Sequence, residues 1–187
     1  MSGILSGAYE LADPPCSLDA HTYIECGLGH NGDSFENARK YGYARLIGIE
    51  VCWRHYINLK HLFDCWSRVT IRHGSTVDVL REVLERDFKT LILLDSHFTN
   101  NGDDEMDPKV GQCPLLKELE IIASVPWVVK PTLLIHDASM FTGKFWKQQN
   151  VPKEFDREQW PSLGEIVETV AEMNYRFAVR RDFIWMW

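Results

Sequence analysis

The sequence has no apolar run long enough to cross a membrane and no surplus of positive charge. No stretch approaches the ~18 apolar residues that indicate a transmembrane helix, and residues 1–15 lack the basic start and apolar core of a secretory signal. The net charge of −7, with histidine neutral, argues against a broad nucleic-acid surface, which needs a basic face. We therefore expect neither a membrane nor a nucleic acid as a partner.

Cysteine shows no pairing pattern. The 5 cysteines are odd in number and none is spaced as Cys-x-x-Cys, so reduced thiols in the cytoplasm are the simplest interpretation. Hydrophobic residues make up 45% and charged residues 25% of the 187 residues, which is enough for a folded core. We expect one domain over residues 1–187, with residues 1–20 as an N-terminal extension.

A glycine-rich turn follows the first strand that the pattern predicts. Gly27 permits a sharp turn, Gly29 lets a ligand approach the main chain, and Gly32 stands where the following helix packs near the strand. A second strand ends at Glu50, 18 residues after Gly32, where its carboxylate is placed to accept hydrogen bonds from ribose hydroxyls. Strand, turn, helix and acid together predict an adenosine-binding α/β unit. The alternative is a glycine loop that only tightens the turn, with Glu50 at the surface.

Glu25 distinguishes between adenosine ligands, because it stands two residues before Gly27. A dinucleotide brings a negative pyrophosphate, whereas the sulfonium and amino groups of S-adenosylmethionine suit an acid. The segment resembles motif I of the class I S-adenosylmethionine-dependent methyltransferases. The resemblance implies that Glu25, Gly27 and Gly29 lie at the methionine end of this cofactor and Glu50 at its ribose.

The rest of the chain alternates between helices and strands. The periodicity predicts helices over 53–65, 77–86, 114–124 and 161–173, strands over 69–73, 90–95 and 132–137, and a hairpin of 175–179 with 183–187. These repeats match the class I methyltransferase fold. The resemblance implies an α/β three-layer Rossmann-like sandwich with strand order 3-2-1-4-5-7-6 and an antiparallel C-terminal hairpin.

Four further motifs lie in the second half: Leu93–His97, Cys113–Glu120, Leu134–Asp137 and Trp160–Leu163. They look like the LDxH, PLLxELExI, IxDD and (W/Y)PSL pattern of a Rossmann-like branch distantly similar to macrocin- and FkbM-type O-methyltransferases. The resemblance covers residues 23–163. It implies methylation of an oxygen on a small molecule or sugar.

In several of those O-methyltransferases, acids at the ends of the fourth and fifth strands hold a divalent metal. The resemblance implies Asp95, His136 and Asp137 as metal ligands, with His97 beside them, although His136 stands where the pattern has an acid. Mixed carboxylate and imidazole ligation suits Mn, Fe, Ni or Zn better than Mg. The alternatives are His97 or His136 as a general base without metal, or purely structural roles. Asp95 is also placed to contact the sulfonium side of the cofactor.

Two loops each allow two interpretations. Ser75 follows the third strand, where the resemblance places the adenine, but it would equally serve as the N-cap of the next helix. Phe145 and Trp146 belong to a loop that either closes over an acceptor or is pinned to the core by its aromatics. The acidic run 101–107 lacks the spacing of a calcium-binding loop.

The function predicted from sequence is thus an S-adenosylmethionine-dependent methyltransferase. His97, His136 and Asp137 are its candidate catalytic residues, and Glu25 argues against an NAD-dependent oxidoreductase, which stays an alternative. A Rossmann-like module that binds the cofactor without catalysis is another. The sequence names no acceptor and leaves open whether the chain forms a homodimer.

Overall fold

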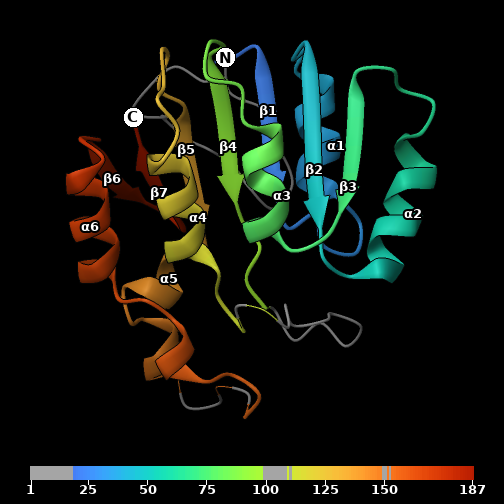
Figure 1. Cartoon of the computed structure of the whole chain (residues 1–187). Coiled ribbons are helices and arrows are strands. Elements are labelled where there is room, and N and C mark those ends of the chain that lie inside the picture. The colour runs from blue at the N-terminus through green and yellow to red at the C-terminus, as the bar shows by residue number, and fades with distance from the viewer. Residues whose placement is uncertain (1–18, 99–108, 110, 149–150, 152) are drawn as a thin grey trace.

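The computed structural model describes residues 19–98, 109, 111–148, 151 and 153–187. Its centre is a 7-stranded sheet in the order β3-β2-β1-β4-β5-β7-β6 (Figure 1). The strands are β1 (Thr22–Cys26), β2 (Arg45–Glu50), β3 (Val69–His73), β4 (Thr90–Leu94), β5 (Thr132–His136), β6 (Phe177–Arg180) and β7 (Phe183–Met186). The first five strands pair in parallel and β7 runs antiparallel to both neighbours, which confirms the order expected from the sequence.

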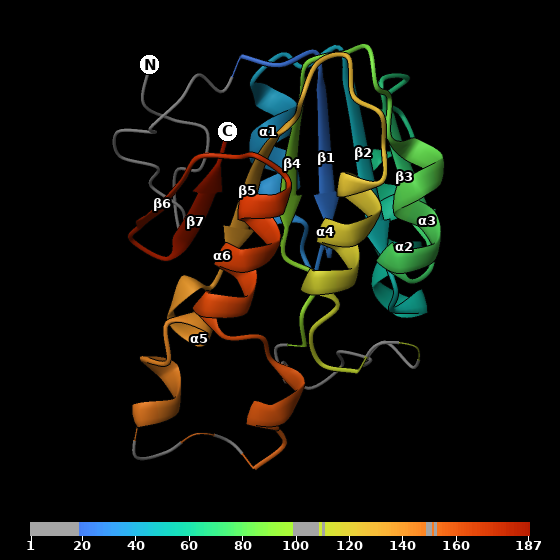
Figure 2. The same cartoon turned by 60° about the vertical axis from the view of Figure 1, so that its left-hand side comes forward.

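Helices cover both faces of this sheet (Figure 2). They are α1 (Asp33–Lys40), α2 (Trp53–Phe63), α3 (Thr76–Val83), α4 (Leu115–Ala123), α5 (Ala138–Phe141) and α6 (Leu163–Glu172), with short 3₁₀ helices η1 (Phe145–Lys147) and η2 (Arg157–Gln159). Apolar residues of α3, α4 and α6 form one core cluster with one face of the sheet, and those of α1 and α2 form a second with the other face. The three-layer sandwich is therefore confirmed. Within the described ranges, no helix is long and apolar enough to span a bilayer.

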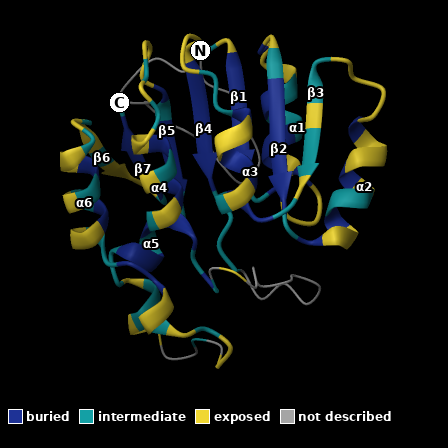
Figure 3. Cartoon of the chain, in the orientation of Figure 1, coloured by how far each residue is buried: buried dark blue, intermediate teal, exposed yellow. Residues whose placement is uncertain are grey.

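The central strands explain the continuous apolar runs in the sequence. Every residue of β1 and β4 is buried, and Figure 3 shows the sheet interior as its most buried part. Ile24 and Ile92 face the layer of α3, α4 and α6, whereas Tyr23 and Leu91 face the layer of α1 and α2. A strand covered on both faces needs apolar residues at successive positions, because neither face meets water.

The predicted helix boundaries differ from the observed ones by up to three residues, and two of the differences have a local reason. The helix predicted over 77–86 begins at Thr76 and ends at Val83, because Leu84 already has extended backbone angles. The helix predicted from residue 161 begins at Leu163. Ser162 caps it, with the Glu165 side chain returning to the Ser162 amide in a capping box.

Candidate functional site

The glycine loop between β1 and α1 packs tightly against the protein at one glycine and is free of protein contacts at another. Gly27 has φ 80°, and a Cβ added there would collide with the carbonyl oxygen of Asp95 and lie 2.6 Å from the Cα of Ser96. Gly29 has φ 63°, and a Cβ added there would meet nothing within 4 Å. Gly27 thus packs the loop against the end of β4, while Gly29 leaves backbone open to a ligand.

Gly32 packs against a different partner than expected. It is the N-cap of α1 with φ 61°, and a Cβ there would lie 2.8 Å from Cδ2 of Leu59. Leu59 belongs to α2. Gly32 thus lies where α1 begins, and the close approach that leaves no room for a Cβ is to α2.

Glu50 organises the glycine loop. Its Oε2 accepts hydrogen bonds from the amides of Leu28 and Gly29, both at 3.0 Å, and its Oε1 accepts one from the Cys52 amide at 2.8 Å. The residue is 4% exposed, and burial raises the pKa of its carboxyl against these hydrogen bonds. The carboxylate lies at the expected end of β2, but in this conformation backbone amides occupy it. Its contact with a ribose stays a prediction.

Glu25 lies beneath the loop and not at its surface. It is 0% exposed, and it accepts hydrogen bonds from the Tyr23 hydroxyl at 2.7 Å and from the Ser34 hydroxyl. Burial raises the pKa of this carboxyl from 4.5 to about 8, so it is mostly protonated at neutral pH. Sequence patterns gave no sign of this network, and direct contact between Glu25 and the methionine end of a cofactor stays a prediction.

Ser75 is the N-cap residue of α3, as one of its two readings proposed. Its hydroxyl makes no capping hydrogen bond and has no partner among the described residues, although the residue is 7% exposed. The backbone carbonyl of Ser75 instead accepts from the amides of Asp78 and Val79. The Ser75 hydroxyl is thus buried without a partner in the described part of the chain, and its contact with an adenine stays a prediction.

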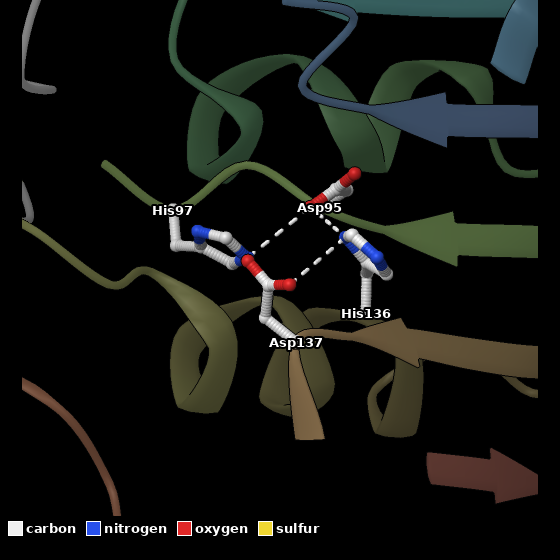
Figure 4. Close-up of side chains that lie close together, drawn as sticks. All are labelled: Asp95, His97, His136 and Asp137. Carbon is white, nitrogen blue, oxygen red and sulfur yellow. Dashed lines mark hydrogen bonds and ion pairs between the residues drawn. The ribbon is translucent and has the colours of Figure 1, made fainter. Parts of the chain in front are cut away.

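Four side chains that the sequence singled out meet where β4 and β5 end (Figure 4). We call them the His–Asp cluster: Asp95, His97, His136 and Asp137. β4 and β5 are adjacent and parallel, so their carboxyl ends share one edge of the sheet. Each residue offers one nitrogen or oxygen atom, and these atoms all lie within 4.8 Å of one another.

The distances in the His–Asp cluster are short. Oδ1 of Asp95 lies 3.1 Å from Nε2 of His97 and 3.1 Å from Nδ1 of His136. Oδ2 of Asp137 lies 3.2 Å from the same His97 nitrogen, and its Oδ1 lies 3.5 Å from His136. Asp137 has φ 54°, an unusual backbone angle that directs it into the cluster, and its carboxylate does not cap α5.

Two observations fit the His–Asp cluster to a metal ion. Donor atoms about 2.1 Å from a tetrahedral metal are separated by about 3.4 Å, close to the spacing found here. Nε2 of His97 faces two carboxylates without hydrogen-bond alignment to either, although the side chain is 5% exposed. Buried imidazole nitrogens normally have a partner. A cation among the four donors would supply it, and the donor set suits a transition metal.

The cluster is also strongly polarised. Burial disfavours the charge of Asp95, yet the hydrogen bond with His136 and the nearby His97 lower the pKa of this carboxyl to about 2. Burial likewise opposes the charge on His136, but the hydrogen bond with Asp95 raises the pKa of that imidazole to about 9. Burial also opposes the charge on His97, but the nearby carboxylates of Asp95 and Asp137 raise the pKa of this imidazole, while burial raises the pKa of Asp137. At neutral pH His136 therefore carries a proton that a metal would displace.

Aromatic side chains wall one side of the cluster. The Trp160 ring lies 5.1 Å from that of His97 between centroids, and its indole nitrogen donates to Oε1 of Gln112 at 2.9 Å. Phe145 and Trp146 pack against the core and contact each other. The aromatics thus pin this loop, as its second reading proposed. The acidic run 101–107 lies outside the described residues.

No protein-family model matches the sequence, and no curated protein matches it at the sequence level. The structure resembles solved methyltransferases. S-adenosylhomocysteine-bound PaMTH1 from Podospora anserina has a TM-score of 0.54 at 16% identity, over 89% of this chain and 70% of that one. A SAM-dependent methyltransferase from Aquifex aeolicus has 0.50 at 11%, over 89% and 80%. An O-methyltransferase family protein from Burkholderia thailandensis has 0.50 at 14%, over 89% and 50%.

The chain has the Rossmann-like fold of S-adenosylmethionine-dependent methyltransferases. Identities this low establish the fold, whereas the macrocin- and FkbM-type branch stays a prediction. In this methyltransferase fold, Gly29, Glu50 and Ser75 lie at the carboxyl ends of successive neighbouring strands. Ligands of open α/β sheets bind at that edge.

The oxidoreductase alternative gains no support from the site. The chain has one Tyr-x-x-x-Lys pair of the kind that short-chain oxidoreductases use, Tyr56 and Lys60. Both lie in α2, which contacts β2 and β3, whereas the His–Asp cluster lies at β4 and β5. Tyr56 contacts the rings of Trp53 and His73, and the Lys60 ammonium lies 5.6 Å from the Tyr56 ring centroid.

Proposed function

We propose that this protein is an S-adenosylmethionine-dependent methyltransferase that acts on an oxygen of a small molecule or sugar with the help of a divalent metal. The observation that carries the proposal is the His–Asp cluster beside the glycine loop, in a fold shared with methyltransferases. Gly27 touches the backbone of Asp95, so the two half-sites are contiguous.

The cofactor half rests on two positions at one edge of the sheet. A Cβ at Gly29 would meet nothing within 4 Å, and the buried Ser75 hydroxyl has no hydrogen-bond partner among the described residues. Glu50 holds the loop amides between these two positions. We infer that adenosine binds across the ends of β1, β2 and β3, with the methyl group directed toward Asp95.

The acceptor half rests on the His–Asp cluster. When bound, a divalent metal would orient and acidify a substrate hydroxyl. Asp95 and Asp137 supply negative charge to hold such a cation, and His97 and His136 fix its position through nitrogen ligands. In methyl transfer the protein mainly aligns acceptor and sulfonium, so a rigid ligand set serves catalysis through positioning.

A metal-free general base is less well supported than a metal. A base must be unprotonated before it can take a proton. The pKa of His136 is raised to about 9 by its hydrogen bond with Asp95 against burial, and that of His97 is raised as well. His136 is therefore held in the protonated form in the metal-free protein, and the upward shift of the His97 pKa acts in the same direction, which favours the metal-assisted interpretation.

Calorimetric titration of the metal-stripped chain tests this proposal. S-adenosylhomocysteine and NADH are titrated separately, each with and without Mn²⁺. We expect S-adenosylhomocysteine to bind with micromolar affinity and NADH to give no heat. Binding of NADH instead would favour the oxidoreductase. Binding of S-adenosylhomocysteine together with failure to bind Mn²⁺, and no turnover in an acceptor screen, would favour the non-catalytic module.

A further inference from the structure

We infer that Glu118 is a positioning residue of the His–Asp cluster: through Ser96 and one buried water it fixes the orientation of His97. The inference rests on the metal site of the proposed function, but it does not depend on methyl transfer. Glu118 belongs to the Cys113–Glu120 motif, to which the sequence assigned no role.

Glu118 is a carboxylate in an apolar environment. It is 1% exposed, in the first turn of α4, and it accepts a hydrogen bond from the Ser96 hydroxyl. Its buried helix neighbours are Leu115, Leu119 and Ile122. Moving a carboxyl group from water into an apolar environment is unfavourable, and the N-terminal end of a helix offsets only part of that cost. An apolar side chain would pack here without a desolvation penalty, so the buried carboxyl group indicates a polar task.

Ser96 connects Glu118 to the His–Asp cluster, because it lies in the sequence between Asp95 and His97. On one side the Glu118 carboxylate holds the Ser96 hydroxyl. On the other side Gly27 packs directly against the Asp95 and Ser96 backbone. The segment that carries two of the donors is therefore held between the glycine loop and α4.

A small cavity completes the link to His97. It has a volume of about 10 Å³, and Ser96, His97 and Glu118 all contribute to its lining. That volume suits one water, which needs two to four polar partners. Nδ1 of His97 is buried without a hydrogen-bond partner among the described residues, and in Figure 4 it points away from both aspartates. A water here would accept from this Nδ1–H and donate to Glu118.

Such a link has a known physical effect on metal ligands. A histidine that binds metal through one ring nitrogen generally donates the other N–H to a carboxylate, a carbonyl or water, which fixes the tautomer and the ring plane. Loss of such a partner typically weakens metal binding by about 10–100-fold. For His97, the water and Glu118 would keep Nε2 directed at the position between Asp95 and Asp137.

Metal affinity in the full chain provides the first test, measured by competition with a chromophoric chelator for Co²⁺ and Mn²⁺. We expect Glu118→Met to weaken binding by about 10–100-fold and Glu118→Gln, which keeps a hydrogen-bonding group, to weaken it less. Glu120→Gln, an exposed position on the same helix, is the matched control and should bind as the wild type does. A folded Glu118→Met chain with wild-type affinity would overturn the inference.

Nuclear magnetic resonance of ¹⁵N-histidine-labelled, metal-free protein provides the second test. We expect a slowly exchanging Nδ1–H signal from His97, assigned by its loss in His97→Gln. It should disappear or exchange rapidly in Glu118→Met and return in Glu118→Gln. A signal unchanged in Glu118→Met would contradict the positioning role. If the wild type binds no metal, the metal part of the proposed function fails, while this signal still decides the role of Glu118.

Discussion

Gly27 lies against the backbone of Asp95, closely enough that any Cβ on the glycine would collide with the carbonyl oxygen of the aspartate. The Asp95 amide also donates to the Cys26 carbonyl at 2.9 Å. These contacts join the glycine loop to the His–Asp cluster. A change in either half of the candidate site is therefore expected to reach the other half.

Gly27→Ala should weaken both cofactor and metal binding. The substitution puts a side chain at φ 80° and against backbone atoms that cannot move aside, so the end of β4 must shift. Gly29→Ala is the control for metal binding alone: its Cβ meets no protein atom, so it carries the strain of about 1–2 kcal/mol of a left-handed residue and should leave Mn²⁺ affinity unchanged, although it lies where the cofactor is expected. Titration with S-adenosylhomocysteine and with Mn²⁺ measures both effects. Wild-type metal affinity in Gly27→Ala would contradict the coupling.

Glu50→Ala should lower the free energy of unfolding as well as cofactor affinity. Removal of the carboxylate leaves the amides of Leu28, Gly29 and Cys52 without their acceptor, and each buried unsatisfied group costs about 1–3 kcal/mol. Glu50→Gln retains one acceptor oxygen and should be milder. Urea denaturation separates the stability effect from the binding effect. Equal stability of Glu50→Ala and the wild type would show that the loop does not depend on this residue.

The pH dependence of stability should reveal the buried Glu25. Burial raises its pKa from 4.5 to about 8 in the folded protein. Between these values the unfolded chain has lost the proton that the folded chain keeps, so stability falls as pH rises. Glu25→Gln removes this ionisable group and with it the pH dependence that it causes. The stability of the variant relative to the wild type should therefore rise from pH 5 to 8, by up to about 1.4 kcal/mol for each pH unit. Parallel stability profiles of variant and wild type would mean that Glu25 ionises normally.

Removal of a single donor from the His–Asp cluster should abolish tight metal binding. His97→Gln and Asp137→Asn each take away one of the four donor atoms, and a loss of about 100-fold or more in Mn²⁺ or Zn²⁺ affinity is expected at pH 7.5, since incomplete ligand sets bind metal poorly. His61→Gln is the matched control, because His61 is exposed on α2. Metal affinity that survives both cluster substitutions would place the metal elsewhere.

The sequence predicted the fold and the His–Asp cluster for the same reason. Apolar runs such as 90–95 indicate buried parallel strands, and residues at the carboxyl ends of adjacent strands must meet at one edge. Asp95 and His136 are separated by 41 positions, yet their atoms lie 3.1 Å apart because β4 and β5 pair. Periodicity predicts the strands, whereas the strand order that brings their ends together came from the resemblance to class I methyltransferases.

Side-chain direction in the loops could not be predicted in this way. The same sequence pattern is compatible with a carboxylate at the end of β2 that faces a ligand and with one that faces the glycine loop. Glu50 faces the loop. The burial of Glu25 depends on the hydroxyls of Tyr23 and Ser34, which no spacing rule connects to it. Glu118 on α4 accepts from Ser96, which follows β4 and is 22 positions away in the sequence. Each depends on packing that the local pattern does not encode.

A crystal structure of the full chain with S-adenosylhomocysteine and Mn²⁺, with anomalous data for the metal, tests the central claim most directly. The account predicts an anomalous peak bounded by Asp95, His97, His136 and Asp137, with the cofactor product lying along Gly29 toward Glu50 and Ser75. Cofactor density away from the glycine loop, or an anomalous map with no peak at the His–Asp cluster, would contradict it.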